Sequence, residues 1–167
     1  MTIAFIAMPA ADAEHLWNGG ADAYGRLPET KTSDGPGYPC RHCLKNIEAG
    51  EELLVLAYRP FPELQPYAET GPIFLHRKPC RRYAAEEVLP PMLSSTDYIV
   101  RGYGQDDRIV YGSGAVTPTE RIASRAEELL ARADVAYVHV RSARNNCYQC
   151  RIDKVEVPAF ADTALAI

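Results

Sequence analysis

Apolar residues in this chain gather in short runs separated by Gly- and Pro-rich turns, a pattern typical of β-strands. The continuous run at residues 53–58 predicts a strand buried on both faces. Pro60 and Pro62 end it, because proline cannot donate a hydrogen bond to a sheet. Two β-rich runs, 98–103 and 108–112, flank four turn-forming residues and predict a hairpin. Further strands are expected at residues 2–8, 73–76, 135–140 and 148–157.

The clearest helix signal begins at residues 117–120, which read Thr-Pro-Thr-Glu. This order gives a capping threonine at Thr117, a proline at the first helical position and a glutamate at the third. Apolar residues then recur at helical spacing over four turns, at Ile122, Ala126, Leu129, Leu130 and Ala133. We therefore predict an amphipathic helix over residues 118–133, with shorter helical turns at 10–17 and 83–89.

Strands outnumber helices in this pattern, and the hairpin favours antiparallel pairing. The expected fold class is therefore α+β, with a mostly antiparallel sheet and the long helix 118–133 packed on one face. The sheet should include residues 53–58, 98–103, 108–112, 135–140 and 149–155. No internal repeat or domain boundary is visible, so residues 1–167 are expected to form a single domain. Within it, we expect a long Gly/Pro-rich loop at 18–39 and a C-terminal tail at 158–167.

Composition agrees with a globular domain, since 167 residues of which 47% are apolar can build a core without a metal or disulfides. The net charge of −4 and pI of about 5.6 give no support for general nucleic-acid binding. Basic residues do cluster at 77–82 and at 141–151. Such clusters are usually solvated surface, and a specific anion site is the alternative.

No uncharged apolar run approaches the roughly 18–20 residues that span a bilayer, so no membrane association is expected. The apolar N-terminus has no Lys or Arg before Arg26, whereas a secretory signal needs a positive segment first. These features predict a cytoplasmic location. In a reducing compartment, five cysteines indicate metal ligands, reactive thiols or core residues before disulfides. The identity of a small-molecule or protein partner stays open.

Two thiols spaced C-x2-C, Cys40 and Cys43, and an imidazole and thiol spaced H-x3-C, His76 and Cys80, make a candidate ligand set for zinc. Structural zinc sites use four such ligands, and their donor atoms should then lie within about 4 Å of one another. The interval between Cys43 and His76 is longer than in compact zinc fingers, so the spacing permits a site without requiring one. In the alternative, Cys40 and Cys80 are small buried hydrophobes and His76 is a hydrogen-bonded strand residue.

A second C-x2-C pair, Cys147 and Cys150, fits either a redox pair or half of a zinc site completed by Cys40 and Cys43. Redox pairs usually open a helix, whose N-terminus lowers the pKa of the first thiol. Here turn-forming asparagines precede the pair and a predicted strand follows it, which argues against a thioredoxin-like role. In a strand the two thiols would face opposite sides, so one should be a core residue.

Two further classes of function stay open. A cysteine-dependent enzyme would pair Cys40 or Cys147 with His76 or His139, but no phosphate-binding glycine loop, H-E-x-x-H or nucleophile elbow is present, so no catalytic residue is assigned. A binding module would use a polar-aromatic pocket for a small anion or peptide. Its candidate lining residues are Tyr58, Tyr67, Tyr103, Tyr111, Arg59, Arg101 and Arg141. Tyrosines also cap sheets for structural reasons.

Several short motifs occur in order between residues 39 and 155. They are residues 39–44 (PCRHCL), 50–51, 58–61, 66–67, 71–76 and Cys80, followed by 136–141 and Cys147. In these motifs the chain resembles a family of small bacterial proteins, domain of unknown function family 1203. The resemblance implies no activity, because the function of that family is not established. The sequence thus predicts a cytosolic, bacterial-type domain to which no reaction can be assigned, with a candidate structural zinc site in segment 40–80.

Overall fold

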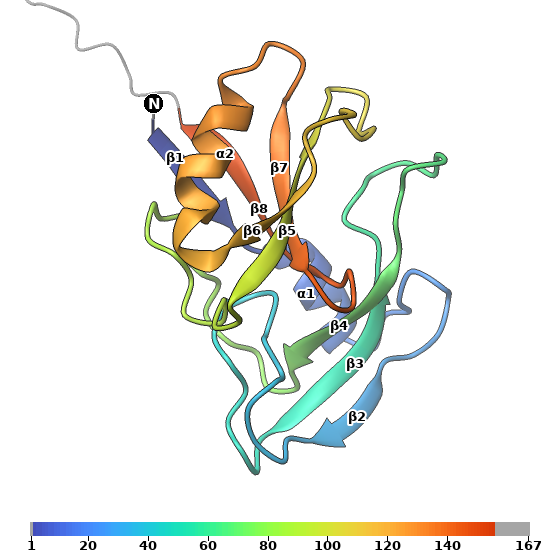
Figure 1. The fold of residues 1–167 in the computed structure, drawn as a ribbon. Coiled ribbons are helices and arrows are strands. Elements are labelled where there is room, and N and C mark those ends of the chain that lie inside the picture. Colours follow the sequence, from blue (N-terminus) through green and yellow to red (C-terminus); the bar gives the residue numbers. More distant parts are fainter. Residues whose placement is uncertain (1, 156–167) are drawn as a thin grey trace, which may run out of the picture.

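The computed structural model describes residues 2–155 and contains two α-helices, one 3-10 turn and eight strands (Figure 1). In chain order the elements are β1 (Thr2–Ile6), α1 (Ala10–Trp17), β2 (Glu29–Thr32), β3 (Glu52–Tyr58), β4 (Gly71–His76), β5 (Asp97–Tyr103), β6 (Ala115–Pro118), η1 (Thr119–Arg121), α2 (Ile122–Leu130), β7 (Tyr137–Ser142) and β8 (Tyr148–Val155). The predicted tail at 158–167 and the last two residues of the predicted strand 148–157 lie outside the described residues.

The strands form two antiparallel sheets, which confirms the α+β class but not the single predicted sheet. One sheet has five strands in the order β1-β8-β7-β5-β6, and the other has three in the order β2-β3-β4. Residues 53–58 lie in β3. This strand is the centre of the smaller sheet, since it pairs with β2 on one side and with β4 on the other. Strand β2 comes from segment 18–39, which was expected to be loop.

The prediction of a long helix over 118–133 is wrong. Pro118 ends strand β6, and a 3-10 turn of three residues leads into α2, which ends at Leu130. Thr117 does not cap the helix, since it is paired with Tyr98 in the sheet. The physical reason is that an extended residue before proline suits the end of a strand as well as a helix cap, and pairing with β5 decides for the strand. The buried face was predicted correctly for Ile122, Ala126, Leu129 and Leu130, which are all buried, whereas Ala133 lies beyond the helix and is exposed.

Two other local predictions are also wrong. Residues 108–112 form no strand, and Ile109 makes only an isolated bridge to Tyr103. The turn extends further than expected because Asp107 and Gly112 both adopt positive φ, at 60° and 79°, so that β6 becomes the partner of β5. Segment 83–89 is not helical, and it lies beside β1 through a bridge between Phe5 and Glu86.

Three groups of buried side chains hold these elements together. The first core lies between α2 and the five-stranded sheet and includes Phe5, Val100 and Leu129. The second core joins α1, the three-stranded sheet and the segment around Cys40. A small aromatic cluster contains Phe61, Tyr103 and Tyr137. Within residues 2–155, no helix has the length and apolar character needed to cross a bilayer.

Candidate metal centre

A tight turn presents the first two cysteines. The backbone N–H of Cys40 donates to Lys45 O at 2.9 Å, and that of Leu44 donates to Cys40 O at 3.0 Å. Leu44 adopts a positive φ of 54°, which turns the chain back on itself. The turn is fixed to β4 by a bridge between Cys40 and Phe74. This arrangement brings the Cys40 and Cys43 thiols to the end of β4, where His76 is the last residue.

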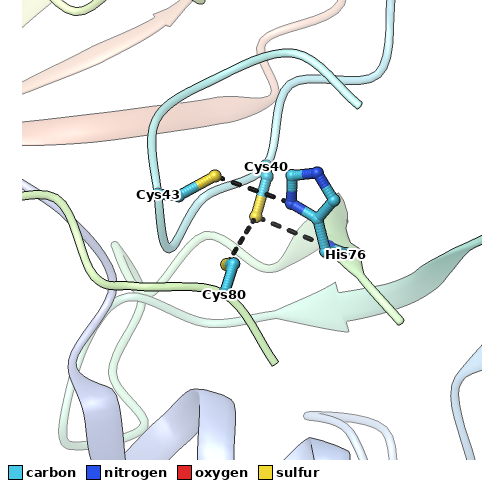
Figure 2. A group of neighbouring side chains, drawn as sticks. All are labelled: Cys40, Cys43, His76 and Cys80. Atoms are coloured by element: carbon cyan, nitrogen blue, oxygen red, sulfur yellow. Dashed lines mark hydrogen bonds between the residues drawn. The ribbon is translucent and has the colours of Figure 1, made fainter. Parts of the chain in front are cut away.

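Figure 2 shows the four side chains converging from three segments of the chain. The Cys40 and Cys80 sulfurs are 3.8 Å apart, and the Cys43 sulfur is 3.5 Å from His76 Nδ1. All four donor atoms lie within 4.8 Å of one another, slightly more than the expected 4 Å. The sulfurs of a tetrahedral zinc site are about 3.8 Å apart, because each Zn–S bond is about 2.3 Å long. The cluster therefore has dimensions compatible with a metal site.

Three residues outside the predicted ligand set surround this cluster, and sequence reasoning gave two of them, Glu51 and Trp17, no role in it. The carboxylate of Glu51 lies 3.5 Å from His76 Nε2, so His76 can present Nδ1 to an ion while its other ring nitrogen is held. Trp17 Nε1 donates to the backbone oxygen of His76 at 2.8 Å. His42 Nδ1 lies 3.4 Å from the Cys80 sulfur, and its ring meets the Trp17 indole edge to face. Outer contacts of this kind orient metal ligands.

The thiols are not equivalent, because they share hydrogen bonds. Hydrogen bonds from Cys43 and Cys80 to the Cys40 sulfur lower the pKa of Cys40. The same contact with Cys40 raises the pKa of Cys43 to about 11 and raises the pKa of Cys80. The pKa of His76 is raised, mainly by its hydrogen bond to Cys40. Of the three thiols, Cys40 is therefore the one whose surroundings most favour the thiolate form that binds a metal.

The residue after Cys40 is a buried arginine. Arg41 is only 1% exposed, and its Nε donates to Tyr148 O at 2.6 Å. Burial lowers its pKa to about 10, which still leaves the guanidinium charged at neutral pH. Because Tyr148 belongs to β8, Arg41 links the cysteine turn to the five-stranded sheet.

The second cysteine pair does not join the cluster. Cys150 lies in β8 and is fully buried, which raises its pKa to about 12. Cys147 is half-buried, and its sulfur lies 3.7 Å from Asn145 O. In the described part of the chain, the only Cys/His group with metal-site spacing is the one built on Cys40. The alternative zinc site shared by the two C-x2-C pairs therefore has no geometric support.

The residues expected to line a polar-aromatic pocket separate into three places. Arg101, Tyr103 and Arg141 converge on Glu69, a residue that sequence reasoning missed; Tyr103 donates at 2.9 Å and Arg141 at 3.3 Å. The hydroxyls of the next pair, Tyr67 and Tyr111, are 2.8 Å apart. The remaining two residues, Tyr58 and Arg59, line a cavity elsewhere.

The fold and the cluster define a small α+β protein with a Cys₃His group of metal-site dimensions. Residues 37–154 match the model of a family described as "Protein of unknown function (DUF1203)", and the chain belongs to that family. The matched residues include the whole cluster, and they confirm the resemblance seen in the sequence motifs. No curated protein and no solved structure matches the chain.

Proposed function

We propose that the protein binds one zinc ion through the sulfurs of Cys40, Cys43 and Cys80 and the Nδ1 atom of His76, and that the ion is structural. The observation that carries the proposal is the convergence of these four donor atoms within 4.8 Å from segments far apart in the sequence. Zinc prefers thiolate and imidazole ligands in a tetrahedron, and a set of four protein ligands is characteristic of structural sites.

Burial supports a structural role over a reactive one. Cys40 is fully buried, Cys43 is 7% exposed and Cys80 is half-buried, so two of the three sulfurs are closed to a substrate. The pKa of Cys40 is lowered by neighbouring thiols. A nucleophile would instead need a nearby base with access to a substrate. We therefore favour zinc binding over the cysteine-dependent enzyme or redox protein. The proposal includes a cytoplasmic location, since reduced thiols persist there.

The ion would join three segments of the chain that meet at the second core. Cys40 and Cys43 belong to the turn, His76 ends β4, and Cys80 follows it. Through Trp17, the same site contacts α1. Binding free energy at such a site contributes directly to folding, because the unfolded chain has no preformed ligand cage.

The test is the metal content of protein purified with neither added metal nor chelator. Elemental analysis should give about one zinc per chain, as four ligands around one centre require. The variant Cys40→Ser should lose the zinc, whereas the matched control Cys147→Ser should retain it. Cobalt substitution should add thiolate charge-transfer absorption to the parent and control only. Zinc-free parent protein that also fails to take up zinc or cobalt would refute the proposal, as would equal loss in both variants.

A further inference from the structure

The three cluster cysteines differ in how far they are open to solvent. Cys40 and Cys43 are buried, whereas Cys80 is half-buried. Cys80 also lies in segment 77–82, which contains four basic residues. Partly exposed, electropositive surroundings of this kind are typical of reactive thiols. Of the three sulfurs, that of Cys80 is therefore the one that a small reagent can reach from solvent.

A second sulfur lies next to the Cys80 thiol. The Cys40 and Cys80 sulfurs are 3.8 Å apart (Figure 2), and a disulfide requires them to approach to about 2.05 Å. Cys40 is fixed in its turn by the bridge to β4. Residues 78–82, by contrast, form neither helix nor strand, and in the described part of the chain their backbone N–H groups donate to no other backbone group. Cys80 can therefore move toward Cys40 without disrupting a sheet.

Metal binding would set the protonation state of both thiols. A thiol that coordinates a metal ion is deprotonated. The thiolate is also the form of cysteine that reacts with oxidants. Coordination thus outweighs the hydrogen bonds that raise the pKa of Cys80 in the metal-free chain. In the zinc-bound protein, Cys40 and Cys80 would be two adjacent thiolates, of which one is open to solvent.

Given the zinc site proposed above, we infer that Cys80 is a site of reversible oxidation by hydroperoxides, and that it forms a disulfide with Cys40 that releases the ion. The Cys80 thiolate attacks a peroxide oxygen, so that an S–O bond forms, the O–O bond breaks and hydroxide leaves. The Cys40 thiolate then attacks the Cys80 sulfur, which forms the S–S bond and expels a second hydroxide. Each hydroxide takes a proton from solvent. Two thiolates, one hydrogen peroxide and two protons thus become one disulfide and two water molecules.

Formation of this disulfide removes half of the ligand set. Only Cys43 and His76 remain, whereas a structural zinc site uses four protein ligands. The ion therefore leaves, and a thiol reductant restores both cysteines and the site. The chain is modified once by the peroxide and does not turn it over. Its metal content would then follow the redox state of its surroundings.

Peptide mapping of the zinc-loaded full chain, treated with a small excess of hydrogen peroxide and then alkylated, tests the inference. Trypsin places Cys40, Cys43 and Cys80 on three separate peptides, 32–41, 42–45 and 78–81. The expected product joins peptide 32–41 to peptide 78–81. A chromophoric chelator should register about one zinc released per disulfide formed. Dithiothreitol should reverse both changes. A bond between peptides 32–41 and 42–45 instead would overturn the inference, and so would zinc release without a disulfide.

Cys147→Ser is the matched control, because Cys147 is half-buried like Cys80 but lies outside the cluster. This variant should form the same disulfide and release zinc as the parent does. In Cys80→Ser, Cys40 and Cys43 should stay reduced, because both are buried. Their oxidation at the parent rate in folded Cys80→Ser protein, checked by circular dichroism, would contradict the inference. If this variant does not fold, the peptide maps of the parent and of Cys147→Ser decide.

The zinc content before oxidation separates this inference from the proposed function. Parent protein that binds no zinc would refute the zinc site, and with it the release of the ion. Zinc-loaded protein in which Cys40 and Cys80 both stay reduced would refute the inference alone.

Discussion

Glu69 is the residue whose loss we expect to be most costly outside the two cores. It lies between β3 and β4, and its carboxylate accepts from the Tyr103 hydroxyl at 2.9 Å and from Arg141 at 3.3 Å, and also pairs with Arg101. The two arginine side chains are 17% and 4% exposed. Glu69→Gln keeps the shape of the side chain and removes the charge that two buried guanidinium groups share.

The magnitude follows from this burial. Removing one partner of a fully buried ion pair costs about 3–5 kcal/mol, because the remaining charge is left uncompensated. The Glu69 side chain is 25% exposed, so water replaces part of what is lost. We therefore expect the free energy of unfolding to fall by about 2 kcal/mol. For a chain of this size, that corresponds to a decrease in Tm of about 4–8 °C.

Equilibrium urea unfolding measures the change, followed by far-UV circular dichroism and by fluorescence of Trp17, the sole tryptophan. Asp134→Asn is the matched control, since it removes a carboxylate paired with Arg132 on the surface, where both side chains are more than a third exposed. Its midpoint should coincide with that of the parent. Equal midpoints for Glu69→Gln and the parent would refute the reasoning, and so would equal shifts in the two variants.

Three other changes have expected outcomes. Burial, and after it the positive charge of Arg141, lowers the pKa of His139 well below 6.5. Below pH 6.5 the unfolded chain therefore binds a proton at His139 that the folded chain does not. The free energy of unfolding should therefore fall as the pH decreases, by up to about 1.4 kcal/mol per pH unit. Urea midpoints measured between about pH 5 and pH 8 should depend less on pH in His139→Gln than in the parent. Gly50→Ala should lower the urea-derived stability by about 1 kcal/mol because its φ is 87°, whereas Gly71→Ala, without positive φ and also in open space, should not. The Gly102 amide donates to the buried Ser113 hydroxyl at 3.0 Å. Ser113→Ala should therefore lower the free energy of unfolding by about 1–3 kcal/mol and speed hydrogen exchange at that amide. An unchanged exchange rate would contradict this prediction.

Local sequence patterns predicted the elements whose apolar residues either repeat at helical spacing or form a continuous run. The spacing of Ile122, Ala126 and Leu129 identified the buried face of α2, and the apolar run at 53–58 identified β3. The start of the helix was predicted wrongly because the same Thr-Pro pair suits both a helix N-terminus and the end of a strand. Pairing with β5, a tertiary contact, decides between them. Strand β2 was missed because all four of its residues are exposed and polar.

The candidate site was likewise predicted in part, because some of its residues follow from local spacing and others from the fold. The four cluster residues were found from sequence because their types and short spacings suit zinc. Glu51 and Trp17 act through contacts with His76 that only the folded chain creates. Glu69 likewise meets Arg101 across an interval of 32 residues. Residue type alone does not distinguish such carboxylates from ordinary surface ones. Their partners become visible only when β4 and β5 are placed in space.

Helix α1 connects the candidate metal centre to the wall of the cavity. Asp12, in its first turn, bonds the Tyr58 hydroxyl beside the cavity, and Trp17, at its end, bonds the backbone of His76. An ion that fixes one end of an eight-residue helix also restricts the other. A zinc ion bound as proposed would hold Trp17 through His76, and the same helix would then steady Asp12 against Tyr58 at the cavity wall.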